Sequence, residues 1–287
     1  MLTLEIGSSK KNDAVSTAVE TSFPFDGAAV ITVGDRTSPN HNLTFATIGA
    51  LADALASART NGARVIVLAS AIPGQWLNHA HLGDLAALMQ GREVPGDPSG
   101  WFRAPHELSG TDVVSIAAIS GNTSGGGCEL GWACDLRIAE QGVLFSQPEV
   151  IIGVGTGIGG TSRLRRLIGR TATAEIVLTG LPVTAERMLA LGGLNKVVPR
   201  GQALAVALEI ARHMVALPAH ALAGMKRMLR EGEDMSLEQA LANDQKISQT
   251  LFRHPQSLVR MEEIQKRYDQ GEQLDGVLWP GLGDRGS

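Results

Sequence analysis

The chain is poor in cysteine and in aromatic residues: its 287 residues include two cysteines, one tyrosine and 4% aromatic side chains. Cys128 and Cys134 are too few for a disulfide framework, and their spacing matches no familiar zinc motif. We therefore expect reduced thiols, no metal and a cytoplasmic location. No apolar run reaches the roughly 18 residues of a membrane span, and the N-terminus lacks a signal-peptide core, so we expect no membrane association.

Neither sign of charge dominates, since 25 Lys and Arg stand against 29 Asp and Glu. The basic residues are scattered, which argues against an extended nucleic-acid surface. With 44% hydrophobic and 19% charged residues, the composition is that of a folded globular protein. The length favours one large domain with a smaller appended segment. We expect a flexible N-terminal extension (1–24), a catalytic core (25–200) and a helical region (201–287).

Short apolar runs alternate with helical patterns and glycine turns, which predicts an α/β fold. A helix with Asn42 or Thr44 as N-cap follows the first run, because apolar residues recur there at helical spacing. The Pro- and Gly-rich stretch 91–109 has no clear period and is interpreted as a mobile loop. After about residue 170 we expect helices only, one of them opened by a capping box at 236–239. The expected strands are 28–33, 64–69, 113–119 and 136–139.

Three glycines, Gly125 to Gly127, follow an expected strand and open an apolar helix. Glycines let the backbone approach a ligand, and amides at a helix N-terminus can hold a developing oxyanion. Glu129 lies in the first turn of this helix among apolar neighbours, where partial desolvation would raise its pKa toward that of an acid/base group. Alternatively, Glu129 is a charge favoured by the helix dipole and the glycines only allow tight packing.

A second carboxylate, Glu149, follows twenty residues later in a turn rich in glycine. Two carboxylates that flank one reactive centre can act as base and acid across it. The alternative for Glu149 is a solvated turn residue. The two glutamates with the glycine amides predict a site that stabilises an enolate-like anion.

The stretches ISGNTSGGGCELGWACDL and FSQPEVIIGVGTGIGG, with AERMLALGGLNKVVP further on, carry a specific resemblance. The chain resembles the crotonase (enoyl-CoA hydratase/isomerase) superfamily, in its hydratase-like branch, from residue 28 to about residue 199. The resemblance implies a spiral core of ββα repeats with a helical C-terminal trimerisation region, and a homotrimer or dimer of trimers. It also implies an acyl-CoA thioester as substrate, so that coenzyme A arrives with the substrate and no other cofactor is needed.

By motif position the resemblance assigns Glu129 and Glu149 to catalysis and Gly126 to the second oxyanion amide. Together the glutamates would add water across the double bond of an enoyl-CoA, as in fatty acid metabolism. The first oxyanion amide falls on Ala80, within the segment WLNHAHL. This segment departs from the family pattern, because His79 replaces the usual glycine and His81 replaces the usual aspartate.

Both histidines are candidates for substrate binding, since imidazoles can donate hydrogen bonds or protons, although both can equally be surface or packing residues. A third departure is Thr156, where the family usually has proline. Trp132 is a candidate for the acyl pocket or for the core.

The phosphates of coenzyme A require cationic partners. Lys226, Arg36 and Arg227 are candidates for them by location in the sequence, and each can equally be a solvated surface group.

Three alternatives remain open. The two histidines could activate water for CoA-independent hydrolysis of a carbon–carbon bond in a β-diketone, as some crotonase-like proteins do. Isomerisation of an enoyl-CoA double bond would differ mainly in the number of carboxylates required. A non-enzymatic member that binds RNA should show a basic stripe, which is absent from the sequence.

Overall fold

The computed structural model describes residues 18–34, 40–273 and 278. A six-stranded sheet in the order β1-β2-β3-β4-β6-β9 forms its centre, and a small sheet in the order β5-β7-β8 lies beside it. Within the large sheet β1 and β2 pair antiparallel, and the other neighbouring strands of the described chain pair parallel. The strands are β1 (Val19–Phe25), β2 (Ala28–Val33), β3 (Val65–Ser70), β4 (Val114–Ile119), β5 (Thr123–Ser124), β6 (Leu136–Glu140), β7 (Leu144–Ser146), β8 (Val183–Thr184) and β9 (Lys196–Val198).

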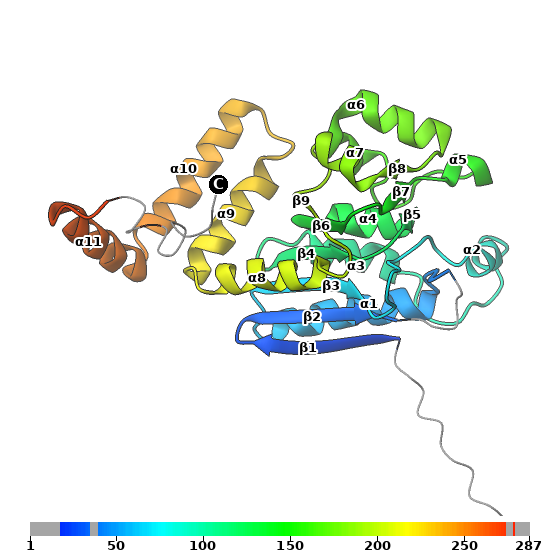
Figure 1. Ribbon diagram of the computed structural model, residues 1–287, viewed down its shortest axis with the longest axis horizontal. Helices are drawn as coiled ribbons and strands as arrows, with labels where there is room; N and C mark the ends of the chain where they lie inside the picture. The colour runs from blue at the N-terminus through cyan, green and yellow to red at the C-terminus, as the bar shows by residue number, and fades with distance from the viewer. Residues whose placement is uncertain (1–17, 35–39, 274–277, 279–287) are drawn as a thin grey trace, which may run out of the picture.

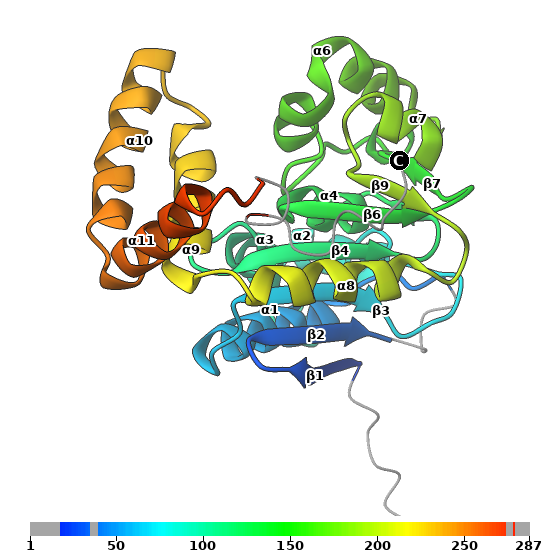
Figure 2. The same cartoon turned by 60° about the vertical axis from the view of Figure 1, so that its left-hand side comes forward.

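Helices cover both faces of the large sheet (Figures 1 and 2). One face carries α8, whose buried Ala203, Ala207 and Ala211 pack on the strands at i, i+4 spacing. The other face packs into the larger apolar core with α1, α3 and α4. The helices are α1 (Phe45–Thr60), α2 (Leu82–Met89), α3 (Gly100–Leu108), α4 (Gly126–Ala133), α5 (Glu149–Ile152), α6 (Ser162–Thr179), α7 (Ala185–Ala190), α8 (Ala203–Val215), α9 (Ala219–Gly232), α10 (Leu237–Phe252) and α11 (Pro255–Asp269).

The predicted α/β class is confirmed, and the repeat of the core is visible in the chain order. The units β4-β5-α4 and β6-β7-α5 follow one another. Their first strands pair parallel in the large sheet and their second strands pair parallel in the small one. This is a spiral of ββα units, and its turn between β5 and α4 carries the triple glycine.

Most of the expected elements form where the sequence places them. The four expected strands correspond to β2, β3, β4 and β6. Thr44 caps α1 by accepting a hydrogen bond from the Thr47 amide at 3.1 Å. The capping box at Ser236 and Gln239 opens α10.

Three expectations are wrong. Val19–Phe25 forms β1, which pairs with β2, so part of the expected extension is a strand; residues 1–17 lie outside the described residues. The expected loop 91–109 contains α3. The region after residue 170 contains β8 and β9, two short strands that complete the edges of the two sheets.

Candidate active site

Glycine is needed at positions 125 to 127 because the backbone there has an unusual conformation and lies very close to its neighbours. Gly125 adopts a φ of +50°, which favours glycine. A Cβ at Gly127 would lie 1.9 Å from the Leu77 carbonyl oxygen, and one at Gly126 would lie 2.5 Å from the Trp101 ring. The Gly125 amide donates to the Ser146 carbonyl at 3.0 Å, which joins the turn to β7. The turn is therefore fixed between the loop that follows β3, the end of β7, and α3.

Two backbone amides are left to face a ligand. Gly126 is the first residue of α4, so its N–H has no acceptor within the helix. Leu43 N–H donates to the His79 carbonyl and His81 N–H donates to the Leu43 carbonyl, so the N–H of the intervening Ala80 points the other way. Neither amide donates to another of the described residues. Both line one cavity, as an oxyanion hole requires.

Glu129 is held by the loop that follows α5. Its side chain is buried, and its Oε1 accepts hydrogen bonds from the Ile158 amide at 2.9 Å and the Gly160 amide at 2.6 Å. These two donors fix the carboxyl group and leave Oε2 for a ligand. The glycine-rich segment after Glu149 therefore has a structural purpose, because it presents amides to the first glutamate.

Glu149 is the first residue of the short helix α5 and lines the same cavity. Burial raises the pKa of its carboxyl group to about 7; a backbone hydrogen bond lowers this pKa, and the neighbouring Glu129 raises it. Its Oε2 is buried and has no hydrogen-bond partner among the described residues. A carboxyl group with a pKa near 7 can both donate and accept a proton at neutral pH, which suits an acid/base group.

The cavity has a volume of about 430 Å³ and brings together five of the eight predicted site residues: His79, Ala80, Gly126, Glu129 and Glu149. The rest of its wall is largely apolar and comes from α2, α3, α5 and the loop beyond α5. Prominent members of this wall are Leu85, Leu88, Met89, Trp101, Phe102, Ile152 and Val154. None of these apolar residues was among the predicted site residues, and Trp101 and Phe102 lay in the expected loop.

The other three predicted residues lie elsewhere. His81 is the N-cap residue of α2, and its Nδ1 lies 2.8 Å from the Asp84 carboxylate and 3.2 Å from the Asp84 amide nitrogen. The ring therefore contacts the first turn of its own helix and does not line the cavity. Trp132 lines a separate cleft of about 380 Å³ between α4, α6 and α9. Its assignment to the acyl pocket is therefore wrong.

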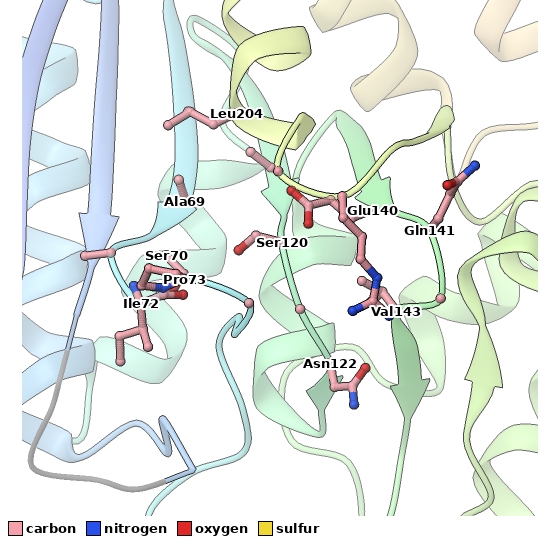
Figure 3. A pocket seen from close by; sticks show the side chains of 17 residues that line it. Ala69, Ser70, Ile72, Pro73, Ser120, Asn122, Glu140, Gln141, Val143 and Leu204 are labelled. Carbon is pink, nitrogen blue, oxygen red and sulfur yellow. The ribbon is translucent and has the colours of Figure 1, made fainter.

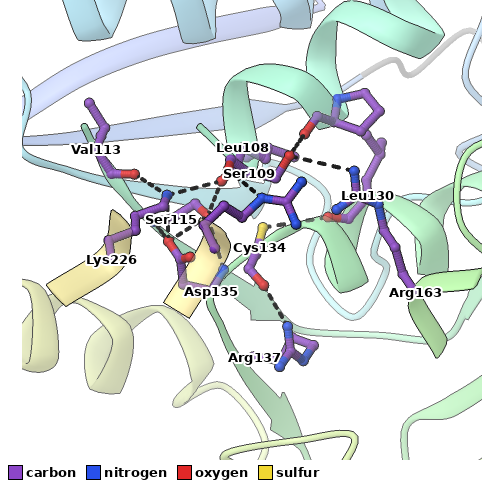
Figure 4. Close-up of polar contacts among 12 residues, drawn as sticks. Leu108, Ser109, Val113, Ser115, Leu130, Cys134, Asp135, Arg137, Arg163 and Lys226 are labelled. Atoms are coloured by element: carbon purple, nitrogen blue, oxygen red, sulfur yellow. Dashed lines mark hydrogen bonds and ion pairs between the residues drawn. The ribbon is translucent and has the colours of Figure 1, made fainter. Parts of the chain in front are cut away.

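The assignment of Lys226 to substrate binding is also wrong. Its side chain is 4% exposed, and its ammonium group lies 2.8 Å from Asp135 Oδ2. It also donates to the carbonyls of Val113 and Leu108 (Figure 4). Asp135 in turn accepts from the Ser115 amide at 2.7 Å. Lys226 thus attaches α9 to the start of β4 and is not available to a phosphate.

The other two residues considered for binding the phosphates of coenzyme A are Arg227 and Arg36. Arg227 is exposed and pairs with Glu231 at 2.9 Å on its own helix. Arg36 lies outside the described residues.

A larger cavity of about 540 Å³ lies at the ends of β3, β4 and β6 and contains no predicted site residue (Figure 3). Its buried carboxylate, Glu140, accepts from the Ala203 amide at 3.3 Å and so satisfies the N-terminus of α8. Ser120, which also lines it, donates to the Gln75 carbonyl at 2.8 Å. These polar groups serve the fold, whereas the two glutamates predicted to be the acid/base pair line the other cavity.

Two negative findings hold for the part of the chain that the structure describes. No group of three or more His, Cys, Asp or Glu side chains is suited to hold a metal ion. No helix combines the length and the apolar character needed to cross a bilayer.

Comparison with known proteins gives a consistent result. The family model described as enoyl-CoA hydratase/isomerase matches residues 26–270. The chain is 38% identical over 127 residues to a short-chain-enoyl-CoA hydratase of Clostridium acetobutylicum, covering 44% of this chain and 49% of that relative. It is 32% identical over 174 residues to the 2,3-dehydroadipyl-CoA hydratase of Escherichia coli, covering 61% and 65%. These matches span about half to two thirds of the relatives' lengths.

Solved structures extend the likeness over nearly the whole fold. The enoyl-CoA hydratase of Thermoplasma volcanium superimposes with a TM-score of 0.75 at 27% identity, covering 86% of this chain and 97% of that one. That of Mycobacterium tuberculosis superimposes with a TM-score of 0.74 at 27% identity, covering 89% and 97%. Because the family model covers most of the chain and the ββα spiral is present, this chain belongs to the enoyl-CoA hydratase/isomerase family, within the crotonase superfamily.

Proposed function

We propose that this chain hydrates 2-enoyl-CoA thioesters whose acyl group is apolar. The proposal rests on one observation: Glu129 and Glu149 line the same cavity, and the wall of this cavity is largely apolar. The same cavity is lined by Ala80 and Gly126, whose backbone N–H groups donate no hydrogen bond to another described residue. The names of the related hydratases support the reaction type.

The geometry supports a division of labour between the two glutamates. Glu129, fixed through Oε1, accepts a proton from water as the water oxygen bonds to Cβ of the enoyl group. The electron pair of the double bond moves toward the thioester, whose oxygen is held by the amides of Ala80 and Gly126. Protonated Glu149 then donates its proton to Cα. One water has been added, and proton exchange with solvent returns both glutamates to their starting states.

The wall of the cavity supports an apolar acyl group. Among the described residues no lysine or arginine lines it, and its charged members are the two glutamates. A carboxylate at the far end of the acyl chain would be buried without a partner, which costs several kcal/mol. This chain should therefore differ in substrate from the E. coli relative, whose name specifies a dehydroadipyl group.

Steady-state assays with crotonyl-CoA, longer apolar enoyl-CoAs and 2,3-dehydroadipyl-CoA test both parts of the proposal. We expect hydration of an apolar substrate with kcat/KM at least about 100-fold higher than for the dicarboxylic one, corresponding to about 3 kcal/mol. Equal kcat/KM values would refute the apolar acyl class. No turnover of any enoyl-CoA, together with no heat of CoA binding in calorimetry, would refute the hydratase assignment and favour β-diketone hydrolysis.

We also propose that the chain self-associates through its C-terminal helices. In α11 no residue is buried, and in α10 only Ile247 is. Large apolar side chains on these helices are exposed, including Leu237 (77%), Leu241 (53%) and Phe252 (59%). Such a surface supports burial against another copy, and a trimer is the assembly expected of the family.

A further inference from the structure

Three titratable side chains of the described chain line the cavity: His79, Glu129 and Glu149. Of these, His79 has no role in the proposed hydration. It occupies the position where the family usually has glycine, and it lines the cavity beside the amide of Ala80. Any catalytic task for His79 rests on the proposed function, because it would concern the proton that Glu149 delivers.

His79 and Glu149 flank the same point of the glycine turn. A Cβ placed on Gly125 would lie 2.9 Å from His79 Cβ and 3.1 Å from Glu149 Oε1. Both side chains also line the cavity. The imidazole therefore reaches the neighbourhood of the carboxyl group either directly or through one water, which is the range over which protons are exchanged.

The tautomer of His79 follows from its backbone contact. Nδ1 lies 2.8 Å from the Ala80 carbonyl oxygen, and because a carbonyl only accepts, Nδ1 carries the hydrogen. In the neutral ring Nε2 is then an acceptor. No hydrogen bond from Nε2 to another described residue is present.

Glu149 supplies the complementary group. Its Oε2 is buried and has no hydrogen-bond partner among the described residues. A protonated carboxyl group is a donor, and a buried donor without an acceptor is unfavourable. An acceptor nearby would remove that cost.

We propose that His79 is a positioning residue that forms a proton-sharing pair with Glu149. Neutral His79 accepts at Nε2, directly or through one water, the hydrogen bond that protonated Glu149 donates. This hydrogen bond keeps Glu149 protonated and in place until the substrate binds, and it breaks as the same proton moves from Oε2 to Cα. After the turnover His79 takes up a proton from solvent at Nε2 and passes it to the Glu149 carboxylate. The proton moves between Oε2 and Nε2, so no other reactant is required.

The surroundings of the pair contain few other charges. Glu129 from α4 faces Glu149 and raises the pKa of its carboxyl group. Cys128, also from α4, is buried with its thiol pKa raised to about 12, so it stays neutral near pH 7. On α5 itself Glu149 is the only titratable residue. A change at His79 should therefore act on Glu149 with little interference.

The test compares His79→Asn and His79→Gln with wild type. Asparagine can keep a donor near the Ala80 carbonyl but has no group at the place of Nε2, whereas glutamine can place its amide oxygen there. Exposed His213 on α8 supplies the matched control, His213→Asn. The readouts are kcat, KM and their pH dependence with an apolar enoyl-CoA.

We expect His79→Asn to lower kcat by about 10- to 100-fold with KM changed less than about threefold. Because Nε2 stabilises protonated Glu149, its loss should move the decline of activity at high pH toward lower pH. His79→Gln should restore part of kcat, and His213→Asn should match wild type. An unchanged kcat and pH profile in His79→Asn would overturn the proposal. So would a loss of activity that follows a loss of thermal stability and is not recovered in His79→Gln.

A measurement without substrate separates this proposal from the proposed function. Infrared difference spectra of wild type, His79→Asn and Glu149→Gln across pH 5 to 9 follow the carboxyl stretch that is absent from Glu149→Gln. A lower ionisation midpoint in His79→Asn than in wild type supports the pair even if no enoyl-CoA is turned over. Identical midpoints contradict it even if hydration is confirmed.

Discussion

The raised pKa of the Glu149 carboxyl group makes the stability of the folded chain depend on pH. The pKa of this group is about 7 in the folded chain against 4.5 for the unperturbed group. The folded state therefore keeps a proton that the unfolded state loses, so this contribution is fully present below pH 4.5 and is lost as pH rises through 7. We expect the melting temperature of wild type, relative to Glu149→Gln, to fall between pH 4.5 and 7. Parallel melting curves for both proteins across this window would contradict the pKa shift.

Two glycines near the cavity, Gly127 at the start of α4 and Gly157 in the loop after α5, differ in the space available to a side chain. Gly127→Ala would place Cβ 1.9 Å from a backbone carbonyl, and backbone cannot move aside cheaply. We expect a loss of about 3 kcal/mol or more in the free energy of unfolding, because overpacking of this kind displaces main chain. For Gly157→Ala nothing lies within 4 Å, and the change should stay within about 0.5 kcal/mol. Equal denaturation midpoints for the two variants would refute the steric account.

Individual residues were predictable where a motif fixed their backbone. Glu129, Glu149 and Gly126 lie where the glycine-rich motifs place them, and Ala80 and His79 line the same cavity. Lys226 was not predictable, because its three partners, Leu108, Val113 and Asp135, are about 90 to 120 residues away in sequence. Whether a lysine is buried or free depends on that tertiary contact.

At the scale of elements, the strands with continuous apolar runs were predictable and the helix α3 was not. Its Pro105 and the Gly- and Pro-rich residues before it favoured a loop. The spacing of Gly100, Ala104 and Leu108, all buried, is helical and was the available signal. The short strands β8 and β9 carry too few residues for any period to be recognised.

The attachment of α9 to the core depends on Lys226. Lys226→Met would leave Asp135 without its buried counter-charge, and we expect a loss of about 3 kcal/mol in unfolding free energy. The adjacent Arg227→Met removes only an exposed ion pair and should cost less than about 1 kcal/mol. Where both variants are folded, KM for the CoA substrate should match wild type. A KM increase confined to Lys226→Met would restore the assignment of this lysine to substrate binding.

At the scale of the whole molecule, α10 and α11 lie to one side of the core, beyond α9 (Figure 1). Their exposed apolar residues predict burial in an assembly. We expect wild type to be a trimer or larger by light scattering after size exclusion, and Leu237→Asp with Leu241→Asp to shift it toward monomer. Wild type that is monomeric at micromolar concentration would contradict the proposed role of these helices.

The overall architecture was largely predictable, because the resemblance extends over most of the core and the ββα repeat depends on local strand and turn signals. The composition of the cavity wall was not predictable, because α2, α3 and α5 come from separate parts of the chain and meet only in the folded structure. The proposed substrate class therefore rests on tertiary structure, whereas the proposed reaction type rests on motifs.

Glu129 and Glu149 are proposed to act together on one enoyl thioester. The most direct measurement is the rate at which wild type, Glu129→Gln and Glu149→Gln remove the conjugated double bond of an apolar 2-enoyl-CoA, with melting temperatures recorded alongside. We predict turnover by wild type and a loss of kcat of at least about 100-fold in each variant while both remain folded. Turnover at the wild-type rate in either folded variant would contradict the claim.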